Sequence, residues 1–110
     1  MNLRKLSDKY SIAEQIQEQD LASLAESGYS DVVCHRPDDE DPGQPSFAEL
    51  EEAGSKYELR FHHIPLTSGV DRVDVVRMAD VLSGASGRVL GYCRTGMRSE
   101  LLWNHANDSF

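Results

Sequence analysis

Short apolar runs alternate along this chain with longer segments whose apolar residues recur at helical spacing. The first run, residues 10–13, precedes a segment in which Leu21, Leu24 and Ala25 share one helical face and Gly28 can end the helix. Further apolar runs, rich in β-branched residues, predict strands at 32–34, within 57–66 and at 88–93. Helical spacing predicts three more helices, at 46–56, 70–84 and 98–107.

The later helices also carry signals for their ends and buried faces. Ser46 is a typical N-cap residue for the helix that follows it. The apolar residues expected to lie on the buried faces of the last two helices are Val73, Val76, Met78, Leu82, Leu101, Leu102 and Trp103. Residues 36–45 (RPDDEDPGQP) lie between the second strand and Ser46, and they are acidic and rich in turn formers. We call this segment the acidic loop and expect it to be mobile.

Strand and helix follow each other four times, and this order is typical of a mostly parallel sheet covered by helices on both faces. We therefore predict a single three-layer α/β domain spanning residues 1–110. In such folds the functional sites lie at the carboxyl ends of the strands.

Composition and charge narrow the functional classes. The chain is 39% hydrophobic and 27% charged, as folded proteins are, and its net charge of −8 disfavours binding to nucleic acids or anionic membranes. No segment approaches the roughly 20 apolar residues of a membrane span, so a cytoplasmic location is expected. The only cysteines, Cys34 and Cys93, are expected to be free thiols, and no metal or cofactor is predicted.

The strongest chemical signal is Cys93, because it follows an apolar strand and precedes a predicted helix near Arg98. Backbone N–H groups at a helix N-terminus favour an anion, and thiol pKa values fall from about 8.5 to roughly 3.5–7.5 in such places. Arg94 and Arg98 add positive charge, and Gly96 permits the backbone conformation that lets amides converge. The sulfur is therefore expected to be charged and exposed. Alternatively, Cys93 is a buried structural cysteine and both arginines are solvated.

Three stretches carry a family resemblance: VVCHRPDDEDPGQPSFAEL, FHHIPLTSG and VLGYCRTGMRS. They are similar to the bacterial beta-lactamase hydrolase-like (DUF442) family, and that resemblance implies the fold of dual-specificity phosphatases. The loop Cys-x-x-Gly-x-Arg also resembles the active-site loop of rhodanese-type sulfurtransferases. The family resemblance implies a role in persulfide metabolism, with a persulfide-oxidising metallo-β-lactamase-like enzyme as a partner.

The loop length separates two candidate reactions. Phosphatases of this fold place His before the cysteine and five residues between it and the arginine, whereas this chain has Tyr92 and four residues. A shorter loop offers fewer amides to a phosphate. We therefore expect a sulfurtransferase that takes sulfur from thiosulfate or a small persulfide onto Cys93 and passes it to a thiol or cyanide. The alternatives are a phosphatase with a phosphocysteine intermediate and a non-catalytic anion-binding or redox-sensing module.

The remaining candidate residues surround Cys93 in the sequence or lie upstream of it. Arg98 is expected to brace the loop and attract the anionic donor, while Arg94, Thr95, Gly96 and Met97 shape the binding site. Ser99 either donates to the thiolate or begins the last helix. Three accessory candidates complete the set: Arg36 orients the acidic loop or is solvated, Asp38 lies on that loop, and Asp71 is a helix cap more readily than a general acid.

Overall fold

The computed structural model describes residues 1–109, with side chains described through Asn107. Its strands are β1 (Leu3–Lys5), β2 (Tyr10–Ala13), β3 (Tyr29–Cys34), β4 (Arg60–His63) and β5 (Arg88–Tyr92). Its helices are the 3-10 turn η1 (Glu18–Asp20), α1 (Leu21–Glu26), α2 (Phe47–Ser55), α3 (Arg72–Gly84) and α4 (Met97–Ser109).

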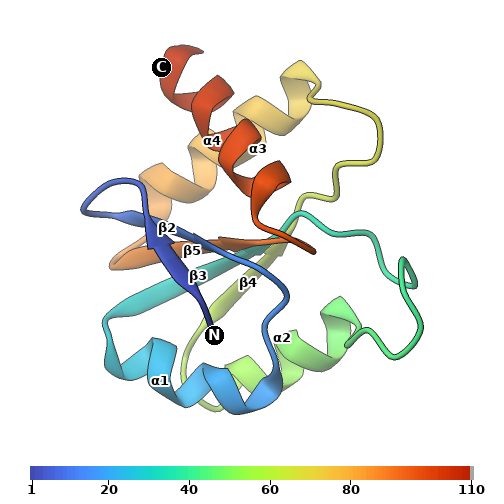
Figure 1. Cartoon of the computed structure of the whole chain (residues 1–110). Coiled ribbons are helices and arrows are strands. Elements are labelled where there is room, and N and C mark those ends of the chain that lie inside the picture. The colour runs from blue at the N-terminus through green and yellow to red at the C-terminus, as the bar shows by residue number, and fades with distance from the viewer. Residues whose placement is uncertain (110) are drawn as a thin grey trace.

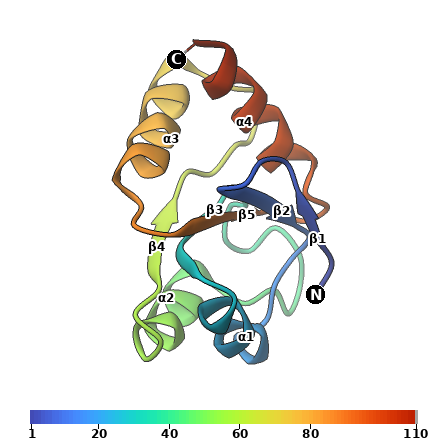
Figure 2. The ribbon, with the colours of Figure 1, turned by 90° about the vertical axis from the view of Figure 1, so that its left-hand side faces the viewer.

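The strands form one sheet in the order β1-β2-β5-β3-β4, in which every pair except β1–β2 is parallel. Helices α1 and α2 cover one face of this sheet, and α3 and α4 cover the other (Figures 1 and 2). The predicted fold class, a mostly parallel sheet between two helical layers, is confirmed.

Each face of the sheet has its own apolar core. Neighbouring residues on a strand point to opposite faces, so Val32 packs beneath α1 and α2 while Val33 packs beneath α3 and α4. On β5, Leu90 packs into the same core as Val32, and Val89 packs into the same core as Val33. Because β5 contributes to both cores, its carboxyl end is held firmly from both sides.

The sequence pattern did not indicate β1, and it misplaced one helical face. Strand β1 has three exposed residues and pairs with β2 only through its backbone, so it leaves no apolar signature.

On α3 the buried residues are Val75 and Met78, whereas Val73 is 66% exposed and Val76 39%. The segment carries two apolar stripes, and the stripe that meets α4 is the buried one. On α4, Leu102 is buried and Leu101 is exposed.

His35 supplies a pH-dependent contribution to stability. Its ring is fully buried, Nδ1 lies 3.0 Å from the Ile64 carbonyl oxygen, and burial lowers the pKa of His35 to about 4. Between pH 6.5 and 4 the unfolded chain therefore binds more protons than the folded one, so stability falls as the pH falls. From pH 7 to pH 4.5 this residue removes on the order of 2 kcal/mol.

The measurement is urea unfolding at pH 7 and pH 4.5 for the wild type and His35→Asn. An asparagine amide can still donate to the Ile64 carbonyl but does not titrate, so the variant should lose less stability on acidification than the wild type. Equal losses in the two proteins would show that His35 is not the group responsible.

Candidate active site

The loop from Cys93 to Arg98 leaves the carboxyl end of β5 and turns into α4 at Met97. Gly91 allows this close approach of strand and helix, because a Cβ at that position would lie 2.0 Å from the Tyr10 hydroxyl and 3.3 Å from the Ser99 Cβ. Any larger residue would displace the Tyr10 side chain and crowd the start of α4 at Ser99. The position of the loop is therefore set by packing on the central strand.

Gly96 provides the turn within the loop. Its φ of +93° lies in the left-handed region that side chains disfavour, and this conformation directs its amide to the Cys93 sulfur at 3.0 Å. The amides of Thr95, Arg98 and Ser99 also lie close enough to that sulfur to favour its charged form. The predicted convergence of loop amides on one atom is what the structure contains.

The electrostatics of the site favour a thiolate at Cys93. Burial by itself raises the pKa of this thiol, but the amides of Ser99, Thr95, Arg98 and Gly96 outweigh burial, and the net pKa is lowered. Cys34 differs, because burial raises its pKa and its Sγ donates to the Arg36 carbonyl at 3.3 Å. Both cysteines are free, and Cys93 is the one suited to be a nucleophile.

One sequence-based expectation about Cys93 is wrong. The sulfur was expected to be exposed, but Cys93 has no solvent-accessible surface. The loop amides close around the sulfur, and the residue also donates its own N–H to the Ala13 carbonyl at 3.4 Å. A substrate therefore reaches the sulfur only after groups over the loop move.

Two carboxylates of the acidic loop meet the arginines of the cysteine loop. Glu40 binds Arg98 in a bidentate pair, with Nη1–Oε2 at 2.9 Å and Nη2–Oε1 at 2.8 Å. Asp41 pairs with Arg94, whose Nε lies 3.1 Å from Oδ2. Hydrogen bonds from Arg98 hold the pKa of Glu40 at about 2, so the ion pair persists across the neutral range.

Arg36 holds these two carboxylates in place. It is 3% exposed, its Nε donates to Glu40 at 2.9 Å, Nη1 donates to the Gln15 side chain at 2.8 Å, and Nη2 pairs with Asp41. Of the two predicted roles for Arg36, orienting the acidic loop agrees with these contacts and solvation does not. The acidic loop, which was expected to be mobile, is thus tied to the rest of the protein through Arg36.

The sequence did not indicate that Glu40, Asp41 and Gln15 belong to this site. The available signal was an acidic stretch in a chain whose cysteine loop carries two arginines, but the pairing spans a separation of 58 residues between Glu40 and Arg98. Sequence alone could not select one carboxylate among the four in that stretch.

The other two acidic candidates are already engaged. The Asp38 carboxylate accepts from the Phe47 amide at 2.8 Å, at the N-terminus of α2. Asp71 precedes α3, and its amide donates to the Asp74 carboxylate at 3.0 Å, as in a helix cap. Neither contact places a proton donor at Cys93.

The remaining loop residues are divided between the surface and the interior. Met97 is 74% exposed, and Ser99 is buried, with its amide towards Cys93 and its hydroxyl without a hydrogen-bond partner among the described residues.

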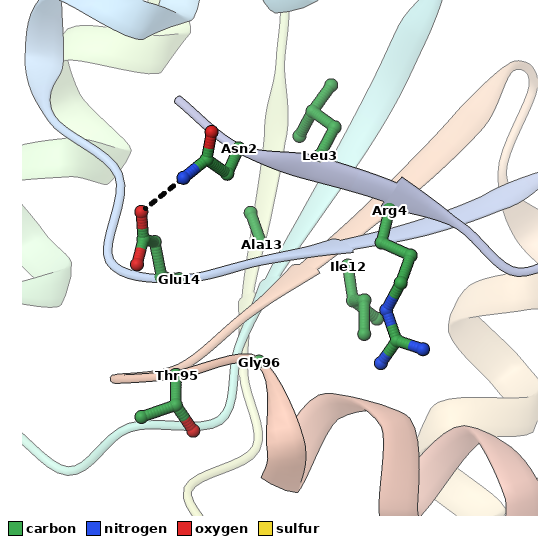
Figure 3. A pocket seen from close by; sticks show the side chains of 8 residues that line it. All are labelled: Asn2, Leu3, Arg4, Ile12, Ala13, Glu14, Thr95 and Gly96. Atoms are coloured by element: carbon green, nitrogen blue, oxygen red, sulfur yellow. Dashed lines mark hydrogen bonds between the residues drawn. The ribbon is translucent and has the colours of Figure 1, made fainter.

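Thr95 and Gly96 line a cavity of about 190 Å³ against the ends of β1 and β2 (Figure 3). The other residues around this cavity are Asn2, Leu3, Arg4, Ile12, Ala13 and Glu14.

The described residues contain no group of three or more histidine, cysteine, aspartate or glutamate side chains arranged to hold a metal ion. They also include no helix that is both long and apolar enough to cross a membrane.

A family model matches nearly the whole chain. It is described as "Beta-lactamase hydrolase-like protein, phosphatase-like domain", and it covers residues 2–109. Curated beta-lactamase hydrolase-like proteins from Agrobacterium fabrum and Xylella fastidiosa are 26% and 23% identical over 104 residues. The alignments cover 94% of this chain but 24% of each relative, so the chain spans about a quarter of their length.

Solved structures show the same fold. A putative phosphatase from Neisseria meningitidis is 33% identical and superposes with a TM-score of 0.85, over 94% of this chain and 74% of that one. A putative phosphatase (DUF442) from Shewanella putrefaciens has a TM-score of 0.81 at 15% identity, over 96% of this chain and 66% of that one. The second likeness concerns the fold alone.

Proposed function

This chain belongs to the family of phosphatase-like domains of beta-lactamase hydrolase-like proteins, and on that premise we propose that it is a cysteine-dependent phosphatase. The observation that carries the proposal is the Cys93 sulfur, which accepts from the Gly96 amide at 3.0 Å and lies near three further amides that favour its charged form, with Arg98 at the end of the same loop. Family membership and the phosphatase fold support phosphoryl transfer over the sulfur transfer expected from loop length. This reverses the order of the two sequence-based hypotheses.

In the proposed reaction the Cys93 thiolate attacks phosphorus, forming a P–S bond as the P–O bond to the leaving group breaks. Arg98 and the loop amides stabilise the charge on the phosphoryl oxygens. Water then attacks the phosphocysteine, which releases inorganic phosphate and restores the thiolate.

The engaged carboxylates indicate which phosphate esters would be cleaved. The Asp38 carboxylate accepts from the Phe47 amide, and Asp71 is the N-cap residue of α3, so the proposed reaction has no dedicated proton donor among the predicted acids. A phenolate departs far more readily than an alkoxide, because the pKa of the corresponding phenol is only about 10. We therefore propose aryl phosphates as the preferred substrate class.

Sulfur transfer is the second candidate, and a specific observation favours it. Only four residues separate Cys93 from Arg98, and the Gly96 amide lies 3.0 Å from the sulfur itself, so the loop fits closely around a single atom. In this reaction the thiolate attacks the outer sulfur of thiosulfate, an S–S bond forms, and sulfite leaves. The Cys93 persulfide then passes its outer sulfur to a thiol or cyanide, with a persulfide-oxidising metallo-β-lactamase-like enzyme as the proposed partner.

One experiment separates these proposals. The wild type is incubated with p-nitrophenyl phosphate and, separately, with thiosulfate; released phosphate is measured in the first sample and intact mass in the second. Phosphatase activity predicts multiple turnovers of the aryl phosphate. A stable one-sulfur adduct that peptide mapping places on Cys93, with no phosphate released, would establish sulfur transfer instead. Failure of both reactions would support the anion-binding alternative.

A further inference from the structure

The geometry of the contact between Glu40 and Arg98 determines which edge of the guanidinium can bind an anion. Glu40 occupies the outer end of the guanidinium, where both its oxygens bind, and Nη1 also donates to the Leu66 carbonyl at 3.2 Å. Nε takes no part in these bonds. The edge formed by Nε and Nη2 therefore stays available, and that edge can bind two oxygens of a phosphate or sulfonate side by side.

The orientation of that edge is fixed by a chain of contacts that reaches the interior. Glu40 Oε1 accepts from Arg98 and also from Nε of Arg36 at 2.9 Å. Arg36 is almost fully buried and is held by Gln15 and Asp41. Movement of the Arg98 guanidinium is thus restrained through Glu40 by a buried, immobile partner.

The charges of this cluster leave it suited to an anion. Three guanidinium groups, those of Arg36, Arg94 and Arg98, meet two carboxylates, those of Glu40 and Asp41. The guanidinium groups exceed the carboxylates by one positive charge, and this charge faces the Cys93 thiolate, in a chain whose net charge is −8. The carboxylates reduce the positive charge without cancelling it.

We propose that Glu40 is a positioning residue that holds the Arg98 guanidinium so that its Nε–Nη2 edge faces the anionic group bound over Cys93. The inference depends on the proposed anion-binding role of Arg98, which phosphoryl transfer and sulfur transfer share. The competing view is that Glu40 imitates the substrate anion and blocks Arg98. The two views predict opposite signs when the carboxylate is removed.

The test variant is Glu40→Gln and the matched control is Asp39→Asn. Asp39 lies next to Glu40 on the same loop, forms no ion pair among the described residues, and has φ of 61°, a conformation that asparagine tolerates. Each variant removes one negative charge from the acidic loop. Any difference between them therefore reflects the contact with Arg98, once equal unfolding temperatures show that both are folded.

The first readout is the dissociation constant of inorganic phosphate, measured by calorimetry, which does not require turnover. A positioning role predicts that Glu40→Gln weakens phosphate binding about 10-fold or more, since misplaced groups lose this much or more, while Asp39→Asn stays near the wild type. Tighter binding by Glu40→Gln would overturn the proposal in favour of blocking. A change equal to that of the control would also overturn it.

A double-mutant cycle with Arg98→Lys supplies the second readout. If Glu40 acts through Arg98, then Glu40→Gln should have almost no further effect on phosphate binding in the Arg98→Lys background. Independent, additive effects would show that Glu40 acts by another route. Because both readouts use phosphate binding, they remain informative if wild-type turnover of aryl phosphate is absent.

Discussion

Cys93→Ser should abolish turnover of p-nitrophenyl phosphate, lowering kcat by about 1,000-fold or more, as removal of a nucleophile does. The loop amides lower the pKa of the Cys93 thiol and so favour the thiolate, but a serine hydroxyl starts from a far higher pKa and stays protonated. The measurement is the initial rate at saturating substrate, with the circular dichroism spectrum and unfolding temperature as checks on folding.

The matched control for this prediction is Cys34→Ser. Cys34 is also a buried free cysteine at a strand end, but its thiol donates to the Arg36 carbonyl, and a serine hydroxyl can do the same. The control should retain most of the activity. Comparable activity in Cys93→Ser and the wild type would remove Cys93 from the mechanism altogether.

Arg98→Lys should lower kcat/KM by about 100-fold, the size of effect seen when one donor to a developing anion is removed. Lysine keeps the positive charge but presents a single ammonium, so it cannot hold both Glu40 oxygens and two substrate oxygens together. The loss should appear in both kcat and KM, because the proposed contact orients the anion as well as binding it.

Arg94→Lys is the control for Arg98→Lys. Arg94 belongs to the same loop and pairs with Asp41, but its side chain is 63% exposed and the ion pair uses Nε alone. A lysine can preserve a pair of that kind, so kcat/KM should change little. Equal losses in the two variants would mean that total positive charge, and not the geometry of Arg98, decides activity.

The sequence predicted the centre of the site because its signals are local. An apolar strand, Cys93, Gly96 and the start of a helix follow each other within a few residues, and each limits the backbone on its own. The same reasoning placed β2, β3 and β5, since buried strands have short, continuous apolar runs. These features require no knowledge of what lies across the fold.

Features that depend on distant contacts were not predictable in this way. The pairing of Glu40 with Arg98 joins segments 58 residues apart, and the burial of Cys93 results from how the loop closes. Strand β1 exists because its backbone matches the edge of β2, and its exposed side chains carry no pattern. In each case tertiary packing decides the outcome.

The most direct test of the account is the ultraviolet titration of the Cys93 thiolate near 240 nm. The absorbance of Cys93→Ser is subtracted from that of the wild type at each pH, so that Cys34 and the tyrosines cancel. Because the loop amides lower the pKa of Cys93, the difference should titrate below the ordinary thiol value of about 8.5. Titration at or above that value would contradict the claim that the loop holds a thiolate.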